Sequence, residues 1–255
     1  MRSKSILWPT IAMLAGLSVL IGLGTWQLQR RDWKLELISR IEARVHADPV
    51  PLEQALAAWR RDGDVEYLHV RLEGTFLNDH EIYLQAVENG VAGWNVYVPF
   101  ATGFRHVIFA PKTVMVNRGF VPDELRDPAK RREGLIEGPV SITGLVRLPP
   151  AERGAFVPEN DVAANAWYWR DMKAMIAAGP ARNRERAPYL PFFVDLDRLP
   201  VPGGWPRGGA TRLELPNRHL EYALTWYGLA LALVGVYAVF IRSRLREGGR
   251  VAAAG

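Results

Sequence analysis

The stretch SILWPTIAMLAGLSVLIGLGTWQLQ, Ser5 to Gln29, contains no formally charged residue. Coiled as a helix at about 1.5 Å per residue, it would reach roughly 37 Å, more than the ~30 Å hydrocarbon core of a bilayer. A second uncharged stretch, YALTWYGLALALVGVYAVFI from Tyr222 to Ile241, would reach about 30 Å as a helix. The sequence therefore predicts two membrane-spanning helices, one near each end of the chain.

The segment between these spans holds roughly 190 residues, enough for one globular domain with its own core. The formal net charge is +5, but the basic residues are scattered among acids or flank the spans, as in RSRLR after Phe240. Such flanks are typical of membrane helices. Arg131 and Arg132 form one further cluster, which suits a solvated loop. The charge pattern favours membrane lipid as a partner over nucleic acid.

The sequence contains no cysteine. This excludes disulfides, cysteine-ligated zinc, iron–sulfur clusters, thiol nucleophiles and covalently attached c-type haem. The sequence motifs of P-loop, serine-hydrolase, zinc-protease and dinucleotide-binding sites are absent as well. We therefore expect no enzymatic activity. A membrane-tethered enzyme would need a nucleophile or a pair of carboxylates that only the fold brings together.

The first span has one alternative interpretation. Arg2 and Lys4 precede it, as in a signal peptide, and Gly22 to Gly24 loosely resembles a cleavage site. The apolar stretch is longer than the about 7–15 residues usual for such a signal, so we expect a retained helix. Basic residues lie on both sides of the spans, but long domains translocate largely regardless of charge. We expect the two termini in the cytoplasm and the domain outside.

These expectations divide the chain into five parts. They are a cytoplasmic N-terminus (1–4), transmembrane helix 1 (5–29), an outer domain (30–219), transmembrane helix 2 (220–241) and a cytoplasmic tail (242–255). Within the outer domain, apolar residues at helical spacing predict an amphipathic extension of the first helix over 30–48, and a β-rich domain is expected over 64–215. A short helix is expected over Pro51–Arg61, ended by Asp62-Gly63-Asp64.

Beyond Asp64 the apolar period changes to two, which indicates half-buried antiparallel strands. The expected strands lie at 68–72, 82–86, 94–98, 107–110, 113–118, 140–148, 192–195 and 211–215. Tyr83 and Tyr97 fall on their outward faces. A helix is expected from about Tyr168 to Gly179, and a loop without regular structure over Pro200–Gly209. Many short strands hide their edges by closing, so the predicted fold class is α+β: two transmembrane helices flanking an antiparallel β-barrel or sandwich-like domain.

His219 differs from the other histidines because it lies where the second helix enters the membrane, just after Asn217, a good N-cap residue. The first helix should leave the membrane at the same level, which brings Arg31 and its neighbours close. The candidate site residues are His219, Trp26, Gln27, Arg30, Tyr222 and Trp226. A neutral imidazole, aromatic walls and cations would suit a flat, apolar cofactor with anionic edges, such as a haem ligated by His219.

The same residues have a simpler interpretation. Aromatic residues at a membrane surface form an ordinary interfacial belt, and arginines there anchor to lipid head groups. His219 could then hydrogen-bond at the surface without binding a metal. Spacing alone favours this simpler interpretation. The other histidines suit surface or packing positions; they are His46, His69, His80 and His106, with His69 expected on the solvent side of a strand.

Four segments resemble the Surfeit locus protein 1 family, membrane proteins that assist assembly of haem-copper cytochrome c oxidase. They are LGTWQLQRRDWKLELI at 23–38, VNRGFVP at 116–122, WYWRDM at 167–172 and PNRHLEYALTWY at 216–227. The segments follow the family order and cover the chain nearly end to end. Two departures are Phe120, where tryptophan is frequent, and Arg218, where a small polar residue is common.

The resemblance implies a bacterial inner-membrane protein with its β-rich domain in the periplasm. It implies an assembly factor that assists haem a insertion into oxidase subunit I, or haem a retention there. Some bacterial members bind haem, and the histidine proposed as their ligand falls on His219. The implied partners are oxidase subunit I and the haem a synthase, with haem a bound transiently. A structural chaperone that holds nascent oxidase subunits without binding haem is the alternative.

Overall fold

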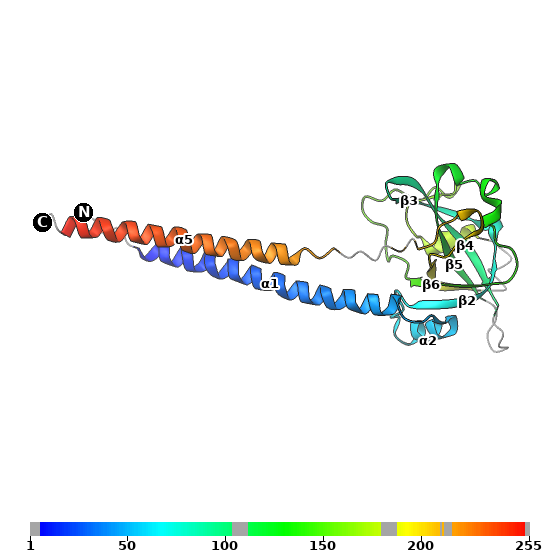
Figure 1. The fold of residues 1–255 in the computed structure, drawn as a ribbon, viewed down its shortest axis with the longest axis horizontal. Coiled ribbons are helices and arrows are strands. Elements are labelled where there is room, and N and C mark those ends of the chain that lie inside the picture. The colour runs from blue at the N-terminus through cyan, green and yellow to red at the C-terminus, as the bar shows by residue number, and fades with distance from the viewer. Residues whose placement is uncertain (1–5, 104–111, 180–187, 210, 212–215, 253–255) are drawn as a thin grey trace. The chain divides into compact units, whose positions relative to one another are not determined.

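A computed structural model describes the chain apart from residues 1–5, 104–111, 180–187, 210, 212–215 and 253–255 (Figure 1). The chain separates into two compact units, Met1–Arg40 with Glu214–Gly255, and Ile41–Leu213. We call them the helical unit and the β-rich unit.

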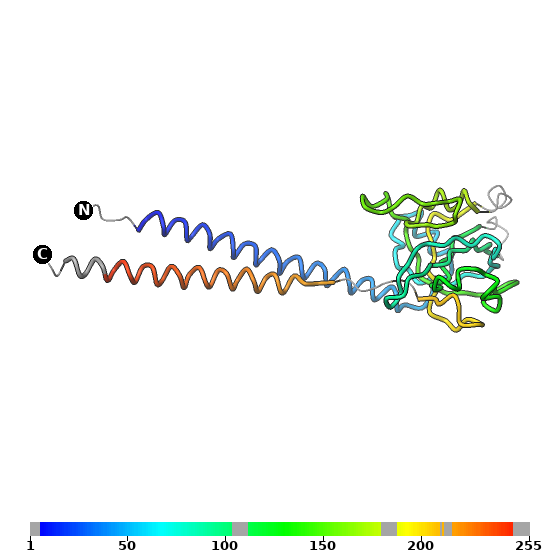
Figure 2. The backbone as a smooth tube through the Cα atoms, turned by 90° about the horizontal axis from the view of Figure 1, so that it is seen from above, coloured from blue at the N-terminus to red at the C-terminus, as the bar shows by residue number. Residues whose placement is uncertain are grey.

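The helical unit is a pair of long antiparallel helices that lie side by side in both views (Figures 1 and 2). They are α1 (Leu7–Val45) and α5 (His219–Ala252). Both are long and apolar enough to cross a membrane. Pro9 is tolerated in α1 because it lies in the first turn, where no intrahelical partner for its missing N–H is needed. Beyond the predicted span, α1 continues without a break to Val45.

The two helices approach closely at small residues. Gly24 of α1 and Ala223 and Ala230 of α5 are buried. A Cβ atom placed on Gly24 would lie 2.8 Å from the ring of Tyr227, and one on Gly16 would lie 3.3 Å from a methyl of Leu233. In lipid no hydrophobic force draws helices together, so small residues that permit close packing favour their association.

Hydrogen bonds also cross between the helices. The hydroxyls of Thr10 and Tyr237 bond to each other, and those of Thr25 and Tyr227 lie 3.1 Å apart. Thr10 lies near the start of α1 and Thr25 lies roughly 23 Å further along, at 1.5 Å per residue. The helices are therefore joined near both ends of the apolar stretch.

The β-rich unit is a sheet whose middle strands form a closed ring. The strands are β1 (Val50–Pro51), β2 (His69–Phe76), β3 (Ile82–Glu88), β4 (Val91–Thr102), β5 (Thr113–Pro122), β6 (Val140–Arg147), β7 (Ala166–Trp167) and β8 (Tyr189–Leu196). They pair in the order β1-β2-β6-β8-β5-β4-β3-β7, and β2 also pairs with β4. Strands β2, β6, β8, β5 and β4 thus close into a barrel, as the strand pattern predicts.

The helices of the β-rich unit are short. They are α2 (Leu52–Asp62) and α3 (Met172–Ala178), with 3-10 turns η1 (Asn78–His80), η2 (Asp123–Leu125), η3 (Pro128–Gly134) and η4 (Pro202–Gly204). Helix α2 ends at Gly63, which has φ 74° and donates its N–H to the carbonyl of Trp59. Glycine adopts this left-handed conformation without steric cost, so the expected end of this helix is confirmed.

The expectation of purely antiparallel pairing is wrong. The pairs β1–β2, β3–β7 and β5–β8 are parallel. Parallel neighbours need a long crossover connection, and the chain between β5 and β8 provides one that carries η2, η3, β6, β7 and α3. The strands expected over 107–110 and 211–215 lie wholly or mostly outside the described residues.

The expectation of half-buried strands is also wrong for the middle of the sheet. Tyr97 of β4 is 2% exposed and Tyr83 of β3 is 7% exposed, although both were expected to face outward. Tyr83 belongs to the larger apolar cluster of the β-rich unit. Tyr97 belongs to a second apolar cluster with Trp167 of β7 and Met175 of α3. The crossover thus covers the outer face of the sheet, so β4 and β5 are buried on both sides.

Two local expectations need correction. The helix expected from Tyr168 begins only at Met172, because Asp171 caps it by accepting the N–H of Ala174 at 3.0 Å. The expected loop over Pro200–Gly209 contains η4 and a backbone pairing in which Phe120 and Arg207 exchange two hydrogen bonds of 2.9 Å.

We expect Gly24→Leu to push the two helices apart, because the added side chain would overlap the ring of Tyr227. The sequence has no cysteine, so cysteines placed at Gln27 and His219 can report helix pairing by cross-linking in detergent. The cross-linked fraction should fall strongly in the Gly24→Leu background. Gly22→Leu is the matched control, because a Cβ atom at Gly22 meets nothing within 4 Å. Equal cross-linking in both backgrounds would contradict the close approach at Gly24.

Candidate functional site

The helical unit brings His219 and Gln27 together. His219 is the first residue of α5, and its Nδ1 lies 2.8 Å from Oε1 of Gln27 on α1. An amide oxygen only accepts hydrogen bonds, so Nδ1 carries the proton and donates. Among the described residues, Nε2 of His219 has no hydrogen-bond partner. One ring nitrogen is thus held by the neighbouring helix, and the other is left free for a ligand.

The other predicted site residues make no polar contact to this pair among the described residues. Trp26 and Tyr222 are 54% and 53% exposed, and Trp226 is half-buried. Arg30 contacts an aromatic ring instead, since its guanidinium lies 4.0 Å from the ring centroid of Trp33, a cation–π geometry.

The N-terminal end of α5 differs from the prediction. The helix begins at His219, so Asn217 lies one residue too early to cap it. The side-chain oxygen of Asn217 is buried and has no hydrogen-bond partner among the described residues. Arg218 precedes the helix and donates to the carboxylate of Glu221 at 2.8 and 3.0 Å. This hydrogen bond raises the pKa of Arg218, and the Glu221 carboxylate complements the positive end of the helix dipole.

Exposed tryptophans mark the ends of the apolar stretch of α1. Trp8 is 73% exposed and Trp26 is 54% exposed. They are separated by roughly 27 Å along the helix, close to the thickness of a hydrocarbon core. Tryptophan is enriched at both membrane interfaces. Gln27 directly follows Trp26, so the pair of Gln27 and His219 lies beside the second of these tryptophans.

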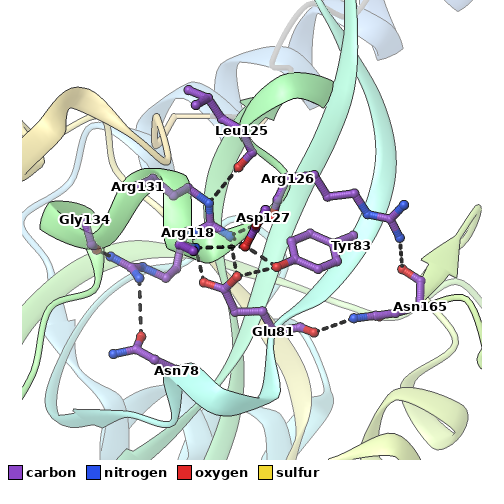
Figure 3. Close-up of polar contacts among 11 residues, drawn as sticks. Asn78, Glu81, Tyr83, Arg118, Leu125, Arg126, Asp127, Arg131, Gly134 and Asn165 are labelled. Carbon is purple, nitrogen blue, oxygen red and sulfur yellow. Dashed lines mark hydrogen bonds and ion pairs between the residues drawn. The ribbon is translucent and has the colours of Figure 1, made fainter.

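The β-rich unit contains a buried polar cluster that the sequence did not reveal (Figure 3). The side chains of Glu81 and Arg131 are each 2% exposed and form a two-point ion pair, with Nη1 of Arg131 2.9 Å from Oε1 of Glu81. Tyr83 donates its hydroxyl to the same carboxylate at 2.6 Å. Arg131 also donates to the carbonyl of Leu125. The expectation that Arg131 lies in a solvated loop is therefore wrong.

A second buried guanidinium belongs to the same cluster. Arg118 donates to the carbonyl of Gly134 and to Oδ1 of Asn78, and it lies 4.7 Å from the ring centroid of Phe76. Its partners are neutral, and burial lowers the pKa of Arg118 to about 10 against the opposing effect of the Glu81 charge. Burial disfavours the charge of Arg131 as well, but the hydrogen bond and charge of Glu81 outweigh it and raise the pKa of Arg131.

The cluster is closed to ligands, because its charged side chains are buried and are hydrogen-bonded to protein groups. Tyr83 comes from β3, Arg118 from β5 and Arg131 from the η2–η3 segment, whereas Asn78 lies in η1 and Glu81 directly precedes β3 (Figure 3). The arrangement holds that segment onto the barrel. In the sequence, a hint was Arg118 within VNRGFVP, a charged residue in a predicted strand that is mostly apolar.

His69 is also placed differently from the prediction. Its side chain is 16% exposed instead of facing solvent. Nδ1 lies 2.8 Å from the carbonyl oxygen of Ala47, and Nε2 lies 2.8 Å from Oδ2 of Asp197. The alternating pattern of β2 predicted an exposed His69. The segments at Ala47 and Asp197 cover the outer face of this strand, so the side chain is largely buried. His80 lies in η1 and His46 follows α1, whereas His106 lies outside the described residues.

We expect Glu81→Gln to destabilise the β-rich unit by about 3–5 kcal/mol, the usual cost of leaving a buried charge without its partner. The substitution keeps the size of the side chain, so the effect would report lost charge compensation for Arg131 and Arg118. Unfolding of the full-length protein in detergent, followed by near-UV circular dichroism, measures it.

The matched control is Arg132→Gln, because Arg132 is exposed beside the buried Arg131. A surface change of this kind usually alters stability by less than about 0.5 kcal/mol. If the two variants unfold alike, the ion pair of Glu81 and Arg131 contributes nothing specific.

Comparison with known proteins identifies one family. The model of the SURF1 family matches residues 14–231. Surfeit locus protein 1 of Homo sapiens is 40% identical over 228 residues, covering 83% of this chain and 70% of the human protein. Surfeit locus protein 1 of Takifugu rubripes is 38% identical over 83% of this chain and 88% of its own length. A SURF1-like protein of Monosiga brevicollis is 35% identical over 97% of this chain and 90% of its own length.

Proposed function

Because this chain belongs to the SURF1 family, we propose that it is a membrane assembly factor for haem-copper cytochrome c oxidase. It assists the insertion of haem a into subunit I, or the retention of haem a there. Its partners are subunit I and the haem a synthase. The β-rich unit serves as the docking surface for these partners and has no catalytic role of its own. The resemblance described above supports the assignment to oxidase assembly.

The observation that carries the haem part of the proposal is the pairing of His219 with Gln27. Imidazole is a common axial ligand of haem iron, and the iron supplies the coordination position that an imidazole nitrogen fills. Nε2 of His219 has no hydrogen-bond partner among the residues that the structure describes, which suits a ligand atom. Trp26, next to Gln27 in the sequence, and Tyr222, three residues after His219, expose aromatic surface, and Arg30 offers a cation for a propionate. These residues, with Gln27 and Trp226, therefore fit a haem.

The proposed location is the bacterial inner membrane, with α1 and α5 as the spans and the β-rich unit in the periplasm. Arginines follow the apolar stretch of α5 at 242, 244 and 246, and an excess of basic residues next to a span favours the cytoplasmic side. The relatives reported above are eukaryotic. The proposed bacterial compartment is supported by the resemblance, and the proposed orientation is supported by this charge pattern.

The rival proposal is a structural chaperone that holds nascent oxidase subunits without binding haem. One observation favours it: the hydrogen bond between His219 and Gln27 is already a complete helix-to-helix contact and needs no cofactor to explain it. Under this proposal the purified protein carries no pigment, yet subunit I co-purifies with it.

The test is the colour of the purified protein. We expect the full-length protein, co-expressed with a haem a synthase, to carry about one haem, because a single histidine is positioned to bind it. His219→Ala should lose the pigment or change its Soret band, since the axial ligand would be gone. The measurement is the absorption spectrum together with haem extraction.

His46→Ala is the matched control, because His46 follows α1 and is not part of the site; it should keep the pigment of the unchanged protein. A colourless unchanged protein would support the chaperone proposal. An unaltered Soret band in His219→Ala would exclude His219 as the ligand.

A further inference from the structure

We infer that Gln27 is a positioning residue that fixes the tautomer of His219 and presents Nε2 as the ligand atom. The inference rests on the proposed haem site for the ligand itself. The tautomer of His219 is a property of the cofactor-free protein. The inference gives Gln27 a specific role, whereas the proposed haem site treats it only as a lining residue.

The tautomer follows from the hydrogen bond between the two helices. Oε1 of Gln27 lies 2.8 Å from Nδ1 of His219. A carbonyl oxygen cannot donate, so the proton must be on Nδ1. A neutral imidazole carries only one proton, and its lone pair is therefore on Nε2. Histidines that bind metals usually donate their other N–H to an oxygen acceptor, which fixes both the tautomer and the ring orientation.

The packing of the helices sets the distance between the side chains of Gln27 and His219. Gly24 lies one turn before Gln27 and is covered by the ring of Tyr227. Ala223 lies one turn after His219 and is 1% exposed. These small residues hold the helices close enough for the Gln27 side chain to reach the imidazole. The hydrogen bond is thus prepared before any ligand arrives, and the ring need not reorient on binding.

A purely structural role for this hydrogen bond makes a different prediction. A bond that only joins the helices could be lost without consequence for ligand binding, provided that other contacts keep the helices paired. Thr25 and Tyr227 form such a contact nearby, with their hydroxyls 3.1 Å apart. Removing that contact should leave the tautomer of His219 unchanged, so it supplies a matched control.

The first experiment measures the tautomer in the cofactor-free protein. The full-length chain, with 15N-labelled histidine, is examined by NMR in detergent, and His219→Ala identifies the resonances. We expect a protonated Nδ1 and an unprotonated Nε2 in the unchanged protein and in Thr25→Val. In Gln27→Leu the Nδ1–H population should fall, and Gln27→Glu should restore it because its carboxylate is again an acceptor. A proton on Nε2 in the unchanged protein would overturn the inference.

The second experiment titrates the same proteins with haemin. Loss of an outer-shell partner typically lowers metal affinity about 10–100-fold, so Gln27→Leu should bind haemin that much more weakly. Thr25→Val should bind as the unchanged protein does, and Gln27→Glu should recover most of the affinity. Equal affinity in Gln27→Leu and the unchanged protein would overturn the inference while leaving His219 as ligand. No haemin binding by the unchanged protein would overturn the proposed haem site, and the inference with it.

Discussion

The helical unit depends on bringing two apolar helices together without a hydrophobic driving force. Lipid chains are as apolar as the helices, so association must come from close packing and from hydrogen bonds between helices. Gly16 and Gly24 permit the close packing. The interhelical hydrogen bonds at Thr10 and at Gln27 lie toward opposite ends of the apolar stretch. The contact at His219 is therefore one member of a series that joins the pair along its length.

The β-rich unit meets a different constraint, which is the cost of burying charge. Glu81 is compensated by Arg131 and by the hydroxyl of Tyr83, whereas Arg118 finds only neutral acceptors and an aromatic ring. A buried ion pair often stabilises a fold no more than apolar side chains of the same size would. We interpret this cluster as fixing where the η2–η3 segment packs on the barrel.

Features that depend on local sequence pattern could be predicted, and features that depend on distant packing could not. The two long uncharged stretches predicted the two apolar helices, and the alternation of apolar and polar residues located most strands. The burial of Tyr97 could not be predicted, because its cover comes from Trp167 and Met175, about 70 to 80 residues later in the chain. Arg131 was predicted to lie in a solvated loop because its partner, Glu81, is distant in the sequence and no local pattern indicates the ion pair. His219 and Gln27 could be paired because Gln27 lies near the end of the first predicted span and His219 lies at the start of the second, at the same membrane surface.

The strand order of the barrel limits how a partner can bind to it. An exposed edge strand offers unpaired backbone groups to which another chain can add a strand. Here the sheet ends in β1 and β7, which are two residues each. Among the described residues, the outermost strands are thus too short to template an incoming strand. Beyond the two residues that β7 covers, β3 pairs with β4 alone over residues 85–88, so this unit offers a partner a short strand edge there and otherwise its side chains and loops.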